Sequence, residues 1–305
     1  MRIGIIAHFK HPIIEPFAGG LEMHTALLTR KLRERGHDVT LFAAERSDPS
    51  LGLEAVCPQT HVNSIGTDEI TNEAFFKEHH AYLDLMTRLR SSSFDVVHNN
   101  SLHYIPITLA DTLPMPMVTT LHTPPFGWLE SGIRAGSKSQ SPLIAVSNSV
   151  ARSWRSSAKV SRVIHNGIDL ETFPYQATAH SDRYLVWFGR IVPEKGLDKA
   201  IEAAIASSST LKIAGPISEP DYFEKTVRPR LSKSIQYVGH LPHTQLARLI
   251  GGASAFVCTP MWEEPYGLVV AEALACGTPV VGFDRGALGE ILTESTGILV
   301  RSGNV

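Results

Sequence analysis

Residues 2–44 read RIGIIAHFKHPIIEPFAGGLEMHTALLTRKLRERGHDVTLFAA, with two apolar stretches on either side of an amphipathic one. Residues 2–9 form a short apolar run, which is typical of a strand buried on both faces. Residues 21–36 show helical periodicity and end at Gly36, and residues 37–44 form a second apolar run. This order predicts a β-α-β unit with parallel strands.

The same alternation continues through the first half of the chain. A helix is predicted at Thr71–Leu89. The further predicted strands are FDVVHNN (94–100), MPMVTTLH (115–122) and SPLIAVSN (141–148). Residues 1–167 are therefore expected to form a Rossmann-like domain with four or five parallel strands.

A second α/β series follows a break in the pattern. Residues 168–182 contain turn residues and show little periodicity, which is typical of a linker. The strands predicted beyond it are 184–191, 211–216, 235–241, 255–260 and 278–284, and the helices are 196–207, 243–253 and 267–277. Residues 183–305 are interpreted as a second domain, and we expect two doubly wound α/β domains that face each other across a cleft.

Composition excludes several classes of protein. The 305 residues are 43% hydrophobic and 19% charged, which is the ordinary range for a globular protein with two cores. The formal net charge is −2, and neither half is basic enough to indicate a nucleic-acid partner. The three cysteines lack metal-type spacing, and neither a signal peptide nor a membrane-spanning stretch is recognisable, so we expect a cytoplasmic protein.

Ligands of such sheets bind at the loops that follow the strands, and two cations lie on one of these loops. Arg190 and Lys195 flank the turn between a predicted strand and a predicted helix. Together with the free amides of that helix they could hold a diphosphate, although two solvated surface cations are the alternative. Gly215 follows the next strand and is expected at the same edge.

Paired glycines, Gly19 and Gly20, precede the first predicted helix. They would let a ligand approach the backbone at the positive end of the helix, or they form only a flexible turn. The third glycine of the dinucleotide fingerprint is missing, which disfavours a nicotinamide-dependent dehydrogenase.

Two carboxylates occur in EEPYGLVVAEAL, residues 263–274. Glu264 is predicted on a loop, whereas Glu272 lies in a nearly all-apolar helix, where an unpartnered carboxylate costs several kcal/mol. The vicinal hydroxyls of a ribose are suitable partners, and a wet stripe on the helix is the alternative. The first amides of this helix, which can bind a phosphate, are those of Gly267, Leu268 and Val269.

His122 ends an apolar strand, where a histidine is often structural, but its expected position at the ligand edge favours a functional role. The sequence has no histidine or cysteine cluster with metal-type spacing and no Asp-x-Asp pair, so we expect neither a metal nor a cofactor. Residues 151–162 combine Trp154 with four basic residues. They are interpreted as a solvated face, with weak membrane-surface contact as the alternative.

Together these stretches resemble the family 4 retaining glycosyltransferases of the GT-B fold. The resemblance extends over most of the chain, and TPMWEEPYGLVVAEALACGTPVV (259–281) is its most specific part, because two glutamates are separated there by seven residues. The other stretches that carry it include PFAGGLEMH (16–24), VIHNGIDLETF (163–173) and FGRIVPEKGLDKAI (188–201).

The resemblance implies transfer of a sugar from a nucleotide diphosphate sugar, with UDP favoured, to an unidentified glycan, lipid or small-molecule acceptor. It implies retention of configuration by same-face displacement. Arg190 and Lys195 would hold the donor diphosphate, and Gly20 would approach the phosphates from the other domain.

By the same resemblance, Glu272 would bind the ribose and Glu264 the hydroxyls of the donor sugar. His122 would lie beside the donor sugar near the reacting carbon. The nucleobase would lie against the backbone of Gly239–Leu241, which includes His240.

Members of the family continue beyond the position of Val305 with helices that cross back to the first domain, so the second domain is expected to lack them here. Two other functions stay open. One is a nucleotide-sugar epimerase, and the other is a nucleotide-sugar-binding protein without transfer activity.

Overall fold

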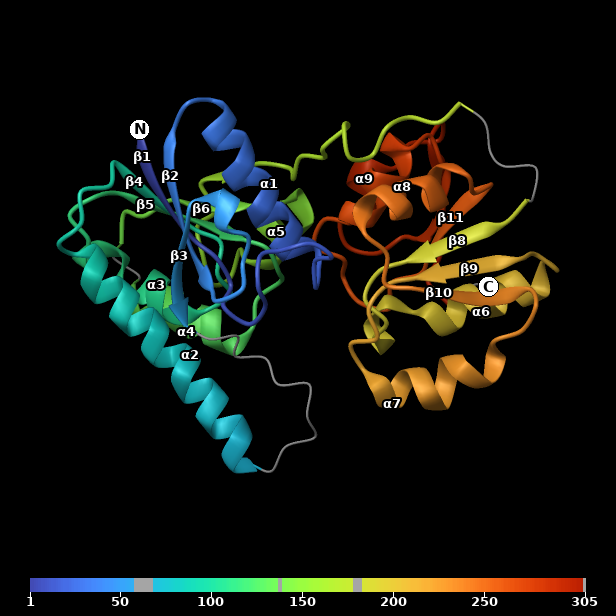
Figure 1. Cartoon of the computed structure of the whole chain (residues 1–305), viewed down its shortest axis with the longest axis horizontal. Coiled ribbons are helices and arrows are strands. Elements are labelled where there is room, and N and C mark those ends of the chain that lie inside the picture. Colours follow the sequence, from blue (N-terminus) through green and yellow to red (C-terminus); the bar gives the residue numbers. More distant parts are fainter. Residues whose placement is uncertain (58–67, 137–138, 178–182, 304–305) are drawn as a thin grey trace. The chain divides into compact units, whose positions relative to one another are not determined.

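The computed structural model describes residues 1–57, 68–136, 139–177 and 183–303, with side chains in the helix from residue 68 described from Glu73. The chain divides into two compact units, Met1–His165 (unit 1) and Asn166–Val305 (unit 2). Each unit holds one parallel sheet with helices packed against it (Figure 1).

The sheet of unit 1 has seven parallel strands in the order β3-β2-β1-β4-β5-β6-β7. The strands are β1 Arg2–Ile6, β2 Asp38–Ala44, β3 Leu53–Cys57, β4 Val96–Asn99, β5 Met117–Leu121, β6 Leu143–Ala145 and β7 Arg162–Val163. The predicted number of four or five was wrong because β3 and β7 were missed. β3 carries a glutamate inside a five-residue run and β7 has only two residues, so neither shows a hydrophobic pattern.

The helices of unit 1 cover both faces of its sheet (Figure 1). Ile3 and Ile5 of β1 pack in one core with Ala26 of the first helix, whereas Ile6 packs in another core with Tyr82. Successive side chains of β1 therefore enter opposite cores, which explains the uninterrupted apolar run. The helices are α1 Gly20–Glu34, α2 Asp68–Leu89, α3 Tyr104–Leu109, α4 Gly127–Ala135 and α5 Asn148–Ser153, with short 3₁₀ segments η1 Pro49–Leu51 and η2 Ala110–Thr112.

Unit 2 has a six-stranded parallel sheet in the order β10-β9-β8-β11-β12-β13. The five predicted strands are present as β8 Leu185–Phe188, β9 Leu211–Ala214, β10 Ile235–Gly239, β11 Ala255–Cys258 and β12 Val280–Phe283, and β13 Gly297–Val300 was missed. The helices are α6 Leu197–Ala206, α7 Pro220–Tyr222, α8 His243–Gly251, α9 Leu268–Ala275 and α10 Leu288–Ile291. Shorter helical segments are η3 Pro193–Lys195, η4 Phe223–Val227 and η5 Arg228–Arg230.

Both strand orders reverse direction once, between β1 and β4 in unit 1 and between β8 and β11 in unit 2. This is the doubly wound arrangement that the β-α-β pattern predicts. Loops diverge where the order reverses, so the carboxyl ends of these four strands are the favoured place for a ligand in each unit.

Much of the segment predicted as a linker packs against unit 2. Phe173 is buried, with its ring centroid 5.3 Å from that of His243, and Gln176 Nε2 donates to the carbonyl of Ala247 at 3.0 Å. Residues 178–182 lie outside the described residues.

Two neighbouring strands of unit 2 approach closely at their carboxyl ends. Gly215, just after β9, has a φ of +144°, and a Cβ placed on it would lie 1.9 Å from the carbonyl oxygen of Gly189. Such a contact is far inside van der Waals distance, so the crossing requires glycine at this position.

We therefore expect Gly215→Ala to lower the free energy of unfolding of unit 2 by more than about 2 kcal/mol, because it adds a steric clash to an unfavourable φ. Gly239→Ala is the matched control, since Gly239 also has a positive φ, of +97°, but nothing within 4 Å of its Cβ position. The control should cost about 1 kcal/mol. Urea unfolding followed by tryptophan fluorescence measures both, and equal losses would show that the close approach is not the constraint.

Candidate functional site

A partly buried ion pair joins the loops that follow β8 and β11 in unit 2. Lys195 is the last residue of η3, just before α6, and its Nζ lies 2.6 Å from Oε2 of Glu264. The two side chains are only 19% and 11% exposed. Glu264 lies on the loop, as predicted. The sequence indicated separate ligand contacts for these residues, and the structure brings them together.

Only part of the bonding capacity of this pair is used inside the protein. Oε2 of Glu264 also accepts a hydrogen bond from Nε1 of Trp262 at 2.9 Å, and Nζ of Lys195 lies 5.1 Å from the centre of the Trp262 ring. Among the described residues, Oε1 of Glu264 has no hydrogen-bond partner, and it is not a fully buried atom. One carboxylate oxygen therefore fixes the pair, while the other oxygen and two ammonium protons can meet a ligand.

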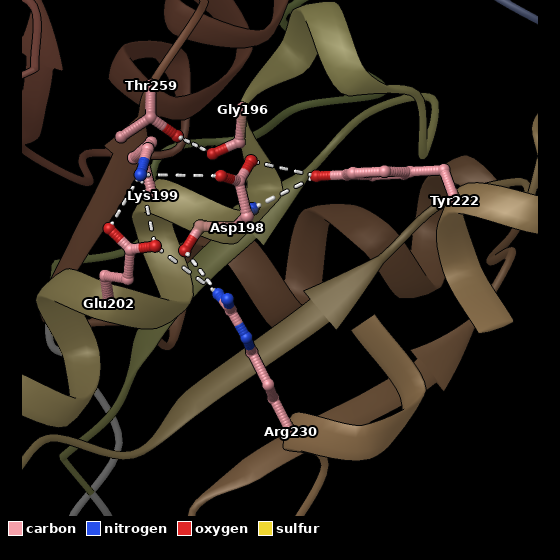
Figure 2. Close-up of polar contacts among 7 residues, drawn as sticks. All are labelled: Gly196, Asp198, Lys199, Glu202, Tyr222, Arg230 and Thr259. Carbon is pink, nitrogen blue, oxygen red and sulfur yellow. Dashed lines mark hydrogen bonds and ion pairs between the residues drawn. The ribbon is translucent and has the colours of Figure 1, made fainter. Parts of the chain in front are cut away.

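Backbone contacts hold the two loops against each other. Thr259 Oγ1 donates to the carbonyl oxygen of Gly196 at 2.7 Å, as Figure 2 shows, and the amide of Met261 donates to the carbonyl of Glu194 at 2.8 Å. Gly196 has a φ of +64°, and a Cβ on it would lie 1.9 Å from the carbonyl oxygen of Thr259. The position of Lys195 is thus fixed by its neighbours in sequence on both sides.

The first turns of α6 are tied to the segment around α7 and η5 by a polar network (Figure 2). Tyr222 donates its hydroxyl to Oδ1 of Asp198 at 3.0 Å and accepts from the amide of Asp198 at 3.2 Å. Arg230 reaches Oε1 of Glu202 at 3.5 Å, and Lys199 reaches Oε2 of Glu202 at 2.9 Å. Partly exposed ion pairs of this kind contribute little to stability, so the network mainly orients the helix that follows Lys195.

The other predicted cation is placed differently. The Arg190 side chain is 43% exposed, and its Nη2 lies 4.0 Å from Oε1 of Glu194, at the limit of an ion pair. Arg190 follows β8 as predicted, and its exposed side chain is free to reorient toward a ligand.

The close approach of Gly215 to Gly189 is a structural reason for a glycine at position 215. The role of Gly215 in donor binding stays a prediction.

The start of α9 faces the same loop edge. Gly267 is its N-cap residue, and the first backbone bonds of the helix run from the amides of Val270 and Ala271 to the carbonyl of Gly267. Within the described part of the chain, the amides of Leu268 and Val269 make no such bond and can bind an anion.

Glu272 is the exceptional residue of α9. Its exposed fraction is 5%, and none of its side-chain atoms makes a hydrogen bond among the residues that the structure describes. Burial raises the pKa of the Glu272 carboxyl to about 8. The carboxyl oxygens of Glu272 are not fully buried atoms, so water or a ligand can reach them, and the contact of Glu272 with a ribose stays a prediction.

Beyond β10, His240 is exposed and Leu241 is half-buried. Their backbone follows the carboxyl end of that strand, as predicted. Their contact with a nucleobase stays a prediction.

The predicted residues of unit 1 also gather at one edge. His122 directly follows β5, is buried, and donates from Nε2 to Oδ1 of Asn100 at 2.9 Å. Its ring lies 5.1 Å from that of His24, one turn along α1 from Gly20, while Gly19 is the N-cap of that helix. The start of α1 therefore lies beside the end of β5.

A cluster of histidines at this edge was not predicted. Burial is the main cause that lowers the pKa of His8 to about 3, those of His24 and His98 to about 4, and that of His122 well below its usual value. These side chains are neutral at pH 7. The available sequence signal was that His8, His98 and His122 each lie in or just after a predicted strand.

Trp154 does not belong to a surface. It is fully buried and donates from Nε1 to the carbonyl of Thr123 at 2.8 Å, so the predicted combination of tryptophan and basic residues on one exposed face was wrong.

No helix in the described ranges has the length and apolar character needed to cross a membrane. Those ranges also contain no group of three or more histidine, cysteine, aspartate or glutamate side chains that could hold a metal ion.

Comparison with known proteins matches each unit to a glycosyltransferase family. The family Glycosyltransferase Family 4 matches residues 18–172, and the family Glycosyl transferases group 1 matches residues 171–305. The chain is 30% identical to glycogen synthase of Mycobacterium tuberculosis, over 98% of this chain and 82% of that protein. It is 26% identical to a D-inositol 3-phosphate glycosyltransferase of Kribbella flavida, over 98% and 83% of the two chains.

Among solved structures, Anabaena Alr3699/HepE in complex with UDP-glucose is similar, with a TM-score of 0.74 and 17% identity over 99% of this chain and 86% of that chain. Two doubly wound units of this kind are typical of the GT-B fold, and the two family matches identify the chain as a glycosyltransferase. The chain belongs to glycosyltransferase family 4.

The raised pKa of Glu272 makes stability depend on pH. The unfolded carboxyl ionises from about pH 4.5, but the folded one stays protonated to about pH 8, so stability is full below pH 4.5 and falls as the pH rises between these values. We expect Glu272→Gln to remove this dependence and to stabilise the ligand-free protein at pH 8 by on the order of 4 kcal/mol. Urea unfolding between pH 5 and pH 8.5 measures it.

The control is Glu219→Gln, at an exposed carboxyl of the same unit, which should leave the pH profile unchanged. Parallel pH profiles for wild type and Glu272→Gln would contradict a buried, protonated Glu272.

Proposed function

We propose that this enzyme transfers a sugar from a nucleotide diphosphate sugar to an acceptor hydroxyl with retention of configuration and without a metal ion. The observation that carries the proposal is the partly buried Lys195–Glu264 pair, whose remaining donors and acceptor lie at the loop edge of unit 2. Glu272, which is buried on the next helix and has no hydrogen-bond partner among the described residues, would supply the matching acceptor for a ribose.

Each part of the donor has a complementary group. The ammonium of Lys195, the guanidinium of Arg190 and the first amides of α9 suit the diphosphate. Two vicinal ribose hydroxyls can donate to the carboxylate of Glu272, and a sugar hydroxyl can donate to Oε1 of Glu264. Gly19 and Gly20 are assigned to the phosphates, and Gly215 and the backbone of Gly239–Leu241 to the nucleotide, by family resemblance.

Catalysis in this proposal consists mainly of stabilising the leaving group. Negative charge grows on the diphosphate as the glycosidic bond breaks, and a cation held in place beforehand lowers that barrier without reorganisation. Oε2 of Glu264 is engaged by two donors, and in this proposal the remaining oxygen, Oε1, accepts a hydroxyl of the donor sugar rather than attacking its reacting carbon. Same-face displacement is the route proposed by family resemblance, in which the departing phosphate oxygen takes the proton of the attacking hydroxyl.

The proposed location is the cytoplasm, and the free thiols of the three cysteines, all buried, favour a reducing compartment.

UDP is the first nucleotide to test, because the Anabaena protein of the same fold was crystallised with UDP-glucose. The acceptor class is open between glycan, lipid and small molecule. A weak membrane contact would have to use exposed basic side chains such as Arg155 and Lys159.

Replacement of Lys195 tests the leaving-group role. We expect Lys195→Ala to lower kcat by at least about 100-fold, with only modest loss of folding stability, because the lost interaction strengthens in the transition state. Donor hydrolysis and transfer assays measure this change. The control is Lys225→Ala, which removes another paired lysine of unit 2 in an exposed pair with Asp221. Near wild-type kcat for Lys195→Ala would contradict the proposed role.

Calorimetric titration with UDP, GDP and ADP tests the donor site directly. One nucleotide should bind, and Glu272→Gln should weaken it at least about 10-fold. The ionised form of Glu272 accepts the ribose hydroxyls best. In the protein without nucleotide, however, the Glu272 carboxyl is largely protonated at pH 7, because burial raises its pKa to about 8. Binding should therefore release up to one proton, seen as a dependence of the heat on the ionisation enthalpy of the buffer.

If no nucleotide binds, the proposed donor site is wrong. Tight binding with no transfer and no donor hydrolysis would favour a binding protein. Formation of an epimerised donor without acceptor would favour an epimerase.

A further inference from the structure

The hydrogen bond between Asn100 and His122 joins the ends of two neighbouring strands of unit 1. Asn100 directly follows β4 and is fully buried, and its amide N–H donates to the carbonyl of Ile6 at 2.9 Å. Its Oδ1 accepts from Nε2 of His122, which directly follows β5. Both residues are thus held by the sheet, so the direction of the imidazole ring depends on this bond.

The chemistry of the amide oxygen determines the tautomer of His122. An amide oxygen only accepts hydrogen bonds, so Nε2 must carry the proton and the lone pair of the neutral ring lies on Nδ1. Nδ1 makes no hydrogen bond with a described residue, and it is not a fully buried atom. The ring therefore presents an acceptor at the ligand edge of unit 1.

The cost of this arrangement suggests that it serves a ligand. Nδ2 of Asn100 is buried without a hydrogen-bond partner among the described residues, and an unpaired buried donor is unfavourable. A hydrophobic side chain would avoid that cost but could not set the tautomer of His122.

The surroundings of His122 oppose a charge on its ring. Within the part of the chain that the structure describes, the titratable groups that face it are His24 from α1, His98 from β4 and His8 from the segment after β1, and none of them is a carboxylate. His98 is itself engaged by Oγ1 of Thr120 at 2.8 Å. An imidazolium at this position would be buried without a counter-ion.

We propose that Asn100 is a positioning residue that holds His122 as the neutral Nε2–H tautomer, with Nδ1 turned to accept a hydrogen bond from a hydroxyl of the bound sugar. The sugar contact rests on the proposed glycosyl transfer, whereas the tautomer does not. A hydroxyl can donate to this lone pair, but an ionised phosphate or carboxylate cannot. This lone pair is therefore suited to a neutral hydroxyl group of the substrate.

The test is ¹⁵N NMR of the full chain labelled at histidine, between pH 5 and pH 8, with His122 assigned by its loss in His122→Gln. The expected wild-type spectrum has a protonated Nε2 and an unprotonated Nδ1, and no titration of His122 in this range. Asn100→Asp should convert the ring to imidazolium at pH 7, because the carboxylate compensates its charge. Asn100→Leu should give a mixture of tautomers.

Thr120→Val is the matched control, since it removes the hydrogen bond of the neighbouring His98 and should leave the His122 signals unchanged. A protonated Nδ1 in the wild type would overturn the proposal, and so would an unchanged His122 tautomer and charge in both Asn100 variants. The wild-type spectrum decides the tautomer even where a variant fails to fold.

Kinetics connect the tautomer to the reaction. Asn100→Leu is expected to lower kcat/KM at least about 10-fold, and Asn100→Asp should regain activity as the pH rises and the extra proton is lost. Equal loss at every pH would indicate a merely structural role and overturn the positioning role. Absence of transfer by the wild type with every donor would refute the proposed function. The NMR spectrum would still decide the tautomer of His122, because that measurement does not depend on activity.

Discussion

Parallel strands buried on both faces are the constraint on which the rest of this molecule depends. Their carboxyl ends all meet at one edge of each sheet, and the reversal of strand order opens that edge to a ligand. Residues distant in sequence, such as Lys195 and Glu264 or Asn100 and His122, become neighbours for this reason alone. The chemistry of the enzyme is therefore concentrated in short loops held by a rigid scaffold.

Close backbone contacts make these loops precise. The positive φ of Gly196 places its backbone against Thr259, and the hydrogen bond from Thr259 closes the same contact. Neither residue needs to touch a ligand. Together they hold Lys195, which directly precedes Gly196, against the loop that carries Glu264. The cation is therefore already in place when the substrate arrives.

The site stores unfavourable interactions that a ligand can relieve. Among the described residues Glu272 is a buried carboxyl without a hydrogen-bond partner, and burial lowers the pKa of His8, His24, His98 and His122 so that they are neutral at pH 7. The buried carboxyl lowers the stability of the free protein at pH 7. Both arrangements are suited to hydroxyl groups. A polar site without bound ligand is thus less stable than an apolar core would be, as expected where function and stability compete.

The sequence by itself determined the alternation of parallel strands and helices in two units, the loop position of Glu264 and the apolar surroundings of Glu272, because these are local patterns of periodicity and turn residues. β3 escaped it because a glutamate interrupts its apolar run, and β7 escaped it because it has only two residues. Only the tertiary structure decided that Lys195 pairs with Glu264 across 69 positions and that Trp154 is buried. Such contacts depend on strand order and register, and a hydrophobic pattern in one chain does not encode which loops those bring together.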